Sequence, residues 1–153
     1  MKILIPTDLS EVSLEAVEFV MQNEYLKKGD IILVYVVDMR GIISAIYTSA
    51  AELQGIIQKE AEKRLKGIQK KFKEQGLEIK YTIRSGEPSD EIVKTAVEKK
   101  VDHIIVSSHG RGALREMFVG SVAVKVTRKS PIPVTIIKPE DVKGRLNQYW
   151  KNA

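Results

Sequence analysis

The sequence predicts one α/β domain in which a parallel sheet of five strands is covered by helices on both faces. Five short apolar runs alternate with stretches of helical periodicity along the 153 residues. Most of these runs are apolar at consecutive positions, which is typical of strands buried between two layers of helices. The length is close to the commonest size of a single domain, and 43% of the residues are hydrophobic.

The first half of the chain provides two strands and two helices. Residues 2–6 form the first strand, and Ser10 is a suitable N-cap for a helix whose apolar stripe extends to about Leu26. Residues 31–37 form the second strand. A long helix then begins near Ser49, which makes a capping-box pattern with Glu52, and we expect it to stop at Gly76.

The second half continues the alternation. Residues 78–84 form a third strand, residues 101–108 include a fourth, and a helix follows each of them. The fifth strand lies at 132–137, where Pro133 cannot donate to a ladder, so we expect this strand at an edge or in a special pairing. The domain spans 1–139, and residues 140–153 form a helical tail that docks on this domain or on a partner subunit.

Composition excludes several classes of protein. The chain has no cysteine, which rules out a disulfide scaffold, a cysteine nucleophile and a thiolate metal site. No apolar run approaches the roughly 20 residues of a membrane span, so we expect a cytoplasmic protein without membrane contact. The net charge is +5, and the basic stretch at 59–80 fits a solvated helix face better than a nucleic-acid surface, because it lacks interleaved aromatic residues.

Ligands of parallel sheets bind beyond the carboxyl ends of the strands. At the end of the first strand, Asp8 can accept hydrogen bonds from a ligand or cap the first helix, and the residues leave both readings open. After the fourth strand, a glycine-containing loop leads to Gly120 and Ser121, which open a helix. Glycine permits close approach to a phosphate, and a helix N-terminus attracts anions. This pattern is neither a Walker A loop nor GxGxxG.

Several motifs together resemble the universal stress protein family over residues 1–139. The resemblance rests on Ile5-Pro6-Thr7-Asp8 with Ser10, Val36-Val37-Asp38, Gly86-Glu87-Pro88, Ser108-His109-Gly110-Arg111-Gly112, Gly120-Ser121-Val122-Ala123 and Ser130-Pro131-Ile132-Pro133-Val134. It implies a Rossmann-like, five-stranded parallel open sheet, similar to that of the adenine nucleotide alpha hydrolases, with strand order 3-2-1-4-5. It also implies a homodimer that pairs through the strand at 132–138.

One branch of this family binds ATP and resembles the pattern Gly-x-x-Gly-x9-Gly-Ser/Thr. In this chain Ser107, Gly110, Gly120 and Ser121 fall on the four positions, so serine replaces the first glycine. The resemblance therefore implies ATP, ADP or AMP as the ligand, with or without Mg²⁺.

The resemblance also assigns residues to parts of the nucleotide. Asp8 and Val36 match the positions around adenine, beside Pro6 and Thr7. Val106 and Ser107 match the ribose side. The phosphate positions are Gly110, Gly120, Ser121 and Val122, Arg111 or Arg115 can add positive charge there, and His109 is expected to brace the loop.

The expected function is a regulatory ATP-binding module. One alternative is the family branch that does not bind nucleotides, which the serine at 107 favours, and another is a slow ATPase, for which no general base is evident. A receiver domain would need an aspartate at the end of the third strand, where this chain has Arg84-Ser85-Gly86. Residues 40–47 are interpreted as a short helix over the sheet end, a dimer contact or a flap over the ligand.

Overall fold

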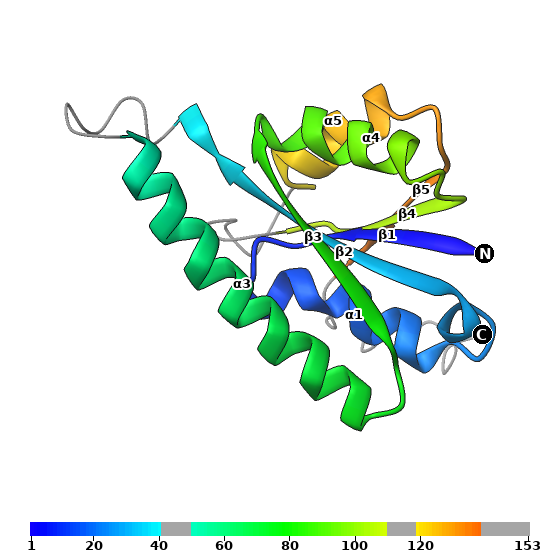
Figure 1. Cartoon of the computed structure of the whole chain (residues 1–153). Helices are drawn as coiled ribbons and strands as arrows, with labels where there is room; N and C mark the ends of the chain where they lie inside the picture. Colours follow the sequence, from blue (N-terminus) through cyan, green and yellow to red (C-terminus); the bar gives the residue numbers. More distant parts are fainter. Residues whose placement is uncertain (41–49, 110–118, 139–153) are drawn as a thin grey trace.

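A five-stranded parallel sheet forms the centre of the computed structural model, which describes residues 1–40, 50–109 and 119–138 (Figure 1). The strands lie in the order β3-β2-β1-β4-β5. Helices cover both faces of the sheet, so the predicted fold class and strand order are confirmed.

The elements follow the predicted alternation. Their bounds are β1 Lys2–Pro6, α1 Glu11–Gln22, the 3₁₀ helix η1 Leu26–Lys28, β2 Asp30–Asp38, α3 Ala50–Glu74, β3 Ile79–Gly86, α4 Pro88–Glu98, β4 His103–Ser107, α5 Ser121–Lys129 and β5 Val134–Ile137. The expected tail at 140–153 and most of the 40–47 segment lie outside the described residues.

Two helix ends show how local chemistry sets the boundaries. Ser10 caps α1 as predicted, and its hydroxyl accepts a hydrogen bond from the backbone N–H of Ser13 at 3.2 Å. The same helix ends earlier than its apolar stripe predicts. The Asn23 side chain accepts hydrogen bonds from the N–H groups of Tyr25 and Leu26, both at 3.0 Å, which stops α1 at Gln22 and starts a short 3₁₀ turn.

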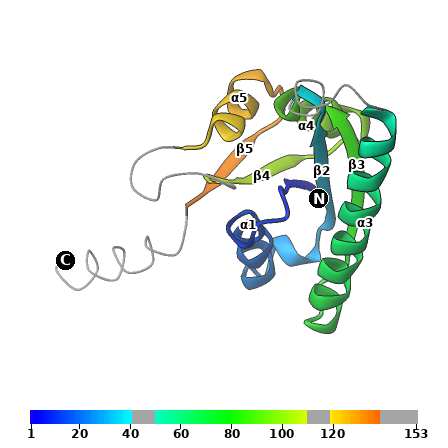
Figure 2. The same cartoon turned by 90° about the vertical axis from the view of Figure 1, so that its left-hand side faces the viewer.

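Alternate residues of each strand pack into two separate cores. Ile3, Ile5 and Leu33 face α1 and α3, where Phe72 is fully buried. Leu4, Val34 and Ile104 face α4 and α5 instead. This division follows from the strand geometry, because successive side chains point to opposite faces. Figure 2 shows α4 and α5 on one side of the sheet and α1 on the other.

The fifth strand lies at an edge of the sheet, which is one of the two placements expected from Pro133. The proline is placed just before β5, and its carbonyl oxygen accepts a hydrogen bond from the N–H of Ile104 at 2.9 Å. Pro133 therefore contributes to the pairing with β4 only through its carbonyl oxygen, since proline has no N–H to donate.

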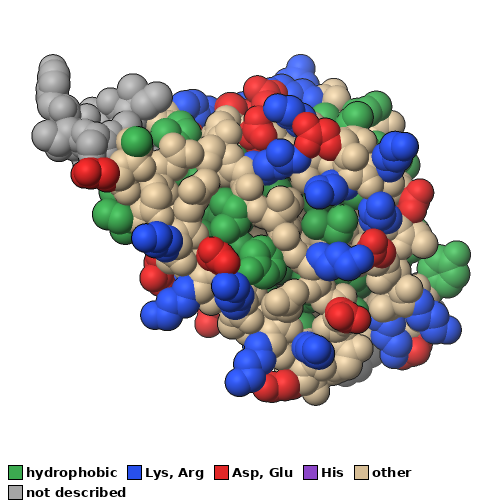
Figure 3. All heavy atoms as spheres, in the orientation of Figure 1, with side chains coloured by type: hydrophobic (Ala, Val, Ile, Leu, Met, Phe, Trp, Pro, Cys, Tyr) green, Lys and Arg blue, Asp and Glu red, His purple; other side chains and the backbone are tan. Residues whose placement is uncertain are grey.

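The outer surface of α3 mixes charges of both signs. Figure 3 shows lysine and arginine side chains interspersed with aspartate and glutamate on this face of the molecule. On α3, Lys66 pairs with Glu62 at 2.8 Å, and on the neighbouring strands Lys80 of β3 pairs with Asp30 of β2 at 2.8 Å. Among the helices of the described ranges, none has both the length and the apolar character of a membrane span.

Candidate functional site

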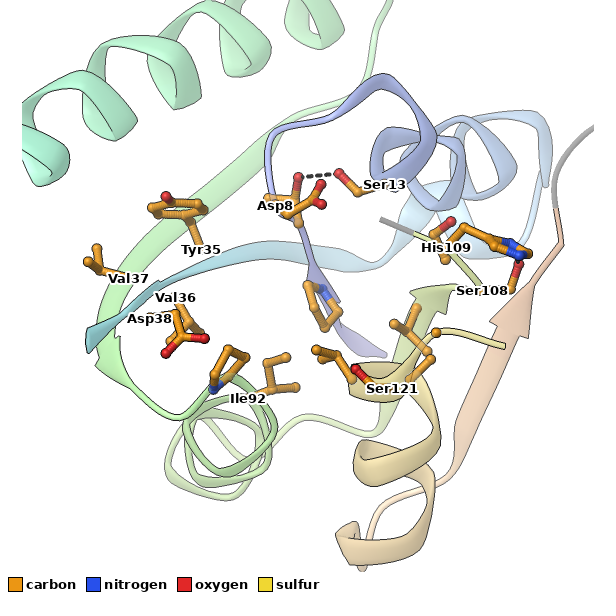
Figure 4. A pocket seen from close by; sticks show the side chains of 18 of the residues that line it. Asp8, Ser13, Tyr35, Val36, Val37, Asp38, Ile92, Ser108, His109 and Ser121 are labelled. Carbon is orange, nitrogen blue, oxygen red and sulfur yellow. Dashed lines mark hydrogen bonds between the residues drawn. The ribbon is translucent and has the colours of Figure 1, made fainter. Parts of the chain in front are cut away.

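A cavity of about 570 Å³ opens at the carboxyl edge of the sheet (Figure 4). It lies where β1, β2 and β4 end and α5 begins, and it includes the gap between β1 and β4. The chain reverses its direction across the sheet at this gap, since β2 lies on one side of β1 and β4 on the other. This is the place where open parallel sheets bind their ligands.

Most of the residues predicted for the site lie together in this cavity. The lining includes Pro6, Thr7, Asp8, Val36, Val106, Ser107, His109, Gly120, Ser121 and Val122. Gly110 and Arg111 lie outside the described residues. The structure thus brings distant parts of the chain to one place, and the contacts of these residues with a ligand stay predictions.

The turn after β1 is held by side-chain hydrogen bonds. The hydroxyls of Thr7 and Ser13 are 2.8 Å apart and share a hydrogen bond, marked by the dashed line in Figure 4. The Thr7 hydroxyl also accepts from the N–H of Leu9 at 2.9 Å. Leu9 has a φ of +67°, a left-handed conformation that costs a non-glycine residue free energy and is often found beside functional sites.

Asp8 supports the start of α1 while it lines the cavity. Its Oδ1 accepts hydrogen bonds from the N–H of Ser10 at 3.0 Å and from the Ser10 hydroxyl at 2.5 Å. Ser10, rather than Asp8, is the N-cap of the helix. The aspartate therefore positions the capping residue, and its carboxylate remains part of the cavity wall.

The end of β4 and the beginning of α5 are in direct contact. The N–H of Gly120 donates to the carbonyl oxygen of Ser108 at 2.5 Å. A Cβ at position 120 would lie 3.1 Å from that oxygen, so glycine permits this close approach. Gly120 is also the N-cap of α5 and provides no side-chain acceptor. The first turn of α5 therefore presents to the cavity a helix end that favours an anion.

Two polar groups near the end of β4 are buried and have no partner among the residues that the structure describes. Ser107 is only 6% exposed, and within the described ranges its Oγ has no hydrogen-bond partner. The Nδ1 of His109 shares a hydrogen bond of 2.7 Å with the Ser108 hydroxyl. The Nε2 of His109 is buried and, among the same residues, also lacks a partner.

A charged pair lies where β2 ends at the cavity. Asp38 lines the cavity, and Arg40 donates to both of its carboxylate oxygens, at 2.9 Å from Nε and 2.7 Å from Nη2. These hydrogen bonds from Arg40 outweigh burial and hold the pKa of Asp38 below its ordinary value. Asp38 is therefore ionised at neutral pH and paired with a cation.

Glu87 joins two cations beside the same opening. Its Oε1 is 3.6 Å from Nη1 of Arg40 and 3.5 Å from Nζ of Lys125. Burial raises the pKa of Glu87, but hydrogen bonds from the Ser89 hydroxyl and the Asp90 N–H, together with the Lys125 charge, lower it to about 2. Glu87 is also the N-cap of α4, so one carboxylate fixes a helix start and neutralises nearby positive charge.

Residues 1–138 match the sequence model of the universal stress protein family. This chain belongs to that family. Universal stress protein MJ0577 of Methanocaldococcus jannaschii is 34% identical over 152 residues, with 90% of this chain and 94% of that protein aligned. The solved structure of MJ0577 has a TM-score of 0.80 and 38% identity, and the match covers 91% of this chain and 96% of that chain. The resemblance predicted from the motifs is confirmed.

Two further solved universal stress proteins contain adenine nucleotides. One is in complex with cAMP, with a TM-score of 0.55, 24% identity, and coverage of 90% of this chain and 96% of that chain. The other, from Arabidopsis thaliana, has AMP bound, with a TM-score of 0.65, 18% identity, and coverage of 94% of both chains. At these identities the likeness shows the shared fold.

The cavity of this universal stress protein also includes residues that were not predicted as site residues. Tyr35, Val37, Ile57 and Ile92 form apolar parts of its wall, and Ser13 and Ser108 add hydroxyls. Tyr35 is adjacent to the predicted Val36, so its position near the end of the second strand could have indicated a place in the cavity wall. Ile57 comes from α3, and no pattern around it indicates that this helix reaches the cavity.

The described acidic and histidine residues do not form a recognisable metal centre. No group of three or more His, Cys, Asp or Glu side chains in these ranges is arranged to hold a metal ion. Asp8 and Asp38 both line the cavity, where Asp8 bonds Ser10 and Asp38 bonds Arg40. Binding of Mg²⁺ with a nucleotide stays a prediction.

Proposed function

We propose that this universal stress protein binds an adenine nucleotide, ATP, ADP or AMP, in the cavity at the carboxyl edge of the sheet. The observation that carries the proposal is the meeting of β1, β4 and the N-terminus of α5 around one cavity of about 570 Å³. In this proposal the protein is a cytoplasmic regulatory module of the stress response, and bound nucleotide is the signal that it reads.

The wall of the cavity changes in chemical character in the way that a nucleotide requires. Near the end of β2, Tyr35, Val36 and Ile92 offer apolar surface to a base, beside Asp38, whose carboxylate is paired with Arg40. Where α5 begins, its first turn offers backbone N–H groups and a partial positive charge to a phosphate. The universal stress proteins that hold cAMP and AMP support the choice of an adenine nucleotide, because they have the same fold.

Calorimetric titration of nucleotide-stripped protein with ATP, ADP and AMP tests this proposal directly. ATP should be titrated with and without Mg²⁺. We expect saturable binding that Gly120→Val weakens roughly tenfold or more, because added side-chain atoms push α5 away from Ser108 and overpacking costs about 1–3 kcal/mol.

Gly67→Ala is the matched control. A Cβ at Gly67 meets no atom within 4 Å, so this variant should bind nucleotide as the wild type does. Thermal unfolding of each variant verifies that it is folded. Absence of binding to the folded wild type would contradict the proposal and favour the family branch that works without nucleotide. Single-turnover hydrolysis above the buffer rate would instead indicate a slow ATPase.

We also propose that the protein is a homodimer that pairs through the strand at 132–138. The edge position of β5 supports this, because an edge strand exposes unpaired backbone groups. The carbonyls of Pro133 and Ile137 accept from β4, so residues 133, 135 and 137 direct their backbone groups inward. The backbone groups of Val134 and Ile136 therefore point away from β4.

This alternation allows a selective test of the dimer. Ile136→Pro removes an outward N–H without removing a bond to β4, and we expect a loss of dimer in light scattering over a dilution series. Ile136→Thr keeps the N–H and the branched side chain, so it should remain dimeric. An unchanged mass for Ile136→Pro would contradict pairing through this strand.

A further inference from the structure

The Ser107 hydroxyl is a buried polar group at the carboxyl end of β4. The residue is the last of β4, it lines the cavity, and it is only 6% exposed. Within the described part of the chain its hydroxyl makes no hydrogen bond. A buried hydroxyl without a partner is unfavourable, and native structures contain few such groups outside functional positions.

The hydroxyls of Thr7 and Ser108 already have hydrogen-bond partners within the protein. The pairing of β1 with β4 ends at Leu4 and Ile104, and beyond it Thr7 and Ser107 both line the cavity. The Thr7 hydroxyl is bonded to the hydroxyl of Ser13 and to the N–H of Leu9. The hydroxyl of Ser108 is bonded to Nδ1 of His109. Among the described residues, the Thr7 and Ser108 hydroxyls are therefore paired, whereas the Ser107 hydroxyl still has its hydrogen-bonding capacity for a ligand.

Ser107 also lies between the two chemically different parts of the cavity. Tyr35 and Val36, on the apolar side, belong to β2, which is separated from β4 by β1. On the other side, the residue that follows Ser107 accepts the N–H of Gly120, where α5 begins. A nucleotide with its base at β2 and its phosphates at α5 has its sugar between them, at the level of Ser107.

We propose that the Ser107 hydroxyl hydrogen-bonds a sugar hydroxyl of the bound nucleotide and makes the cavity select ribonucleotides over their deoxy analogues. This inference rests on the proposed function. Ser107 lines the cavity, and its hydroxyl can change between staggered rotamers without breaking a hydrogen bond among the described residues. Glycine, which the related ATP-binding motif has at this position, cannot make this contact.

The test is a titration of ATP, 2′-deoxy-ATP and 3′-deoxy-ATP into the wild type and three variants. We expect the wild type to bind ATP roughly fivefold to tenfold more tightly than at least one deoxy analogue, the effect of one neutral hydrogen bond. Ser107→Ala and Ser107→Gly should bind ATP only as tightly as that analogue. The matched control is Ser130→Ala, which removes a hydroxyl bonded to the Ile132 carbonyl outside the cavity and should retain the preference.

Three results would overturn the inference. The first is equal ATP affinity of the wild type and Ser107→Ala, and the second is an equal loss for ATP and both deoxy analogues. The third is a lower melting temperature of Ser107→Ala without nucleotide, because it would reveal a partner within the protein. A folded wild type that binds none of the nucleotides overturns the proposed function as well, whereas a binding wild type with an unaffected Ser107→Ala overturns only the role of Ser107.

Discussion

The two edges of the sheet use the same five strands and differ in how their polar groups are satisfied. At the amino edge, the N–H of Lys2 donates to Oδ2 of Asp102 at 2.6 Å, and the N–H of Asp102 donates to the Lys2 carbonyl at 2.8 Å. The N–H of Asp30 donates to the Met1 carbonyl at 2.9 Å. At the carboxyl edge, the Ser107 hydroxyl and the His109 Nε2 are buried and have no partner among the described residues.

This difference indicates that the amino edge of the sheet contributes to stability, whereas the carboxyl edge provides the candidate site. At the amino edge, the chain returns from each helix into a strand, and backbone and carboxylate groups pair with one another. At the carboxyl edge, the turn after β1 and the start of α5 leave a cavity between them. We expect changes at the amino edge to alter stability alone and changes at the carboxyl edge to alter ligand binding.

The largest expected effect comes from the core on which both edges depend. Leu33 in β2 is fully buried between the sheet and the α1–α3 layer, so Leu33→Ala leaves a cavity in the interior. We expect the free energy of unfolding to fall by about 2–5 kcal/mol, measured by urea denaturation. Leu33→Met, which conserves most of the volume, is the control, with an expected cost below about 1.5 kcal/mol. An equal cost for both variants would contradict a cavity effect.

A smaller effect is expected at Glu87, which caps α4 at the carboxyl edge. Glu87→Ala removes the acceptor for the Asp90 N–H and should reduce the free energy of unfolding by about 1–2 kcal/mol at neutral pH. The pKa of Glu87 is lowered in the folded protein from an ordinary 4.5 to about 2. Its charge therefore stabilises the fold above about pH 4.5, and this contribution disappears as the pH falls from 4.5 to 2.

Urea denaturation at a series of pH values measures this contribution. The difference between the wild type and Glu87→Ala should narrow over the acid window. Glu87→Gln keeps an oxygen acceptor without the charge, so it should lose less stability than Glu87→Ala at neutral pH. A difference between wild type and Glu87→Ala that stays constant down to pH 2 would show that the charge does not contribute.

The smallest effect is expected at the amino edge. Asp102→Ala removes the carboxylate that accepts the Lys2 N–H, and because this hydrogen bond is exposed we expect a loss of about 1 kcal/mol in the free energy of unfolding. Nucleotide affinity, measured by calorimetry, should not change. Asp102→Asn retains an acceptor and should restore much of the stability. Weakened nucleotide binding by Asp102→Ala would remove the distinction between the two edges.

Local patterns were sufficient to predict much of the architecture. Ser10 caps α1, Gly76 has a φ of +87° beyond the end of α3, and β5 lies at an edge, one of the two placements expected from Pro133. The early end of α1 was not predicted, because the apolar stripe continues past Asn23. The Asn23 side chain nevertheless accepts hydrogen bonds from the N–H groups of Tyr25 and Leu26, which follow it in the chain. A capping hydrogen bond overrode the periodicity at that point.

The sequence by itself determined the fold class and the family, because apolar periodicity, caps and motif spacing operate between residues that are neighbours in the chain. Only the tertiary structure decided that Ile57 and Tyr35 line the same cavity, and that Glu87 lies within 4 Å of both Arg40 and Lys125. It also decided that the Ser107 hydroxyl is buried while its neighbours pair with one another. Such contacts join elements far apart in sequence and depend on how the helices pack on the sheet, which no local pattern records.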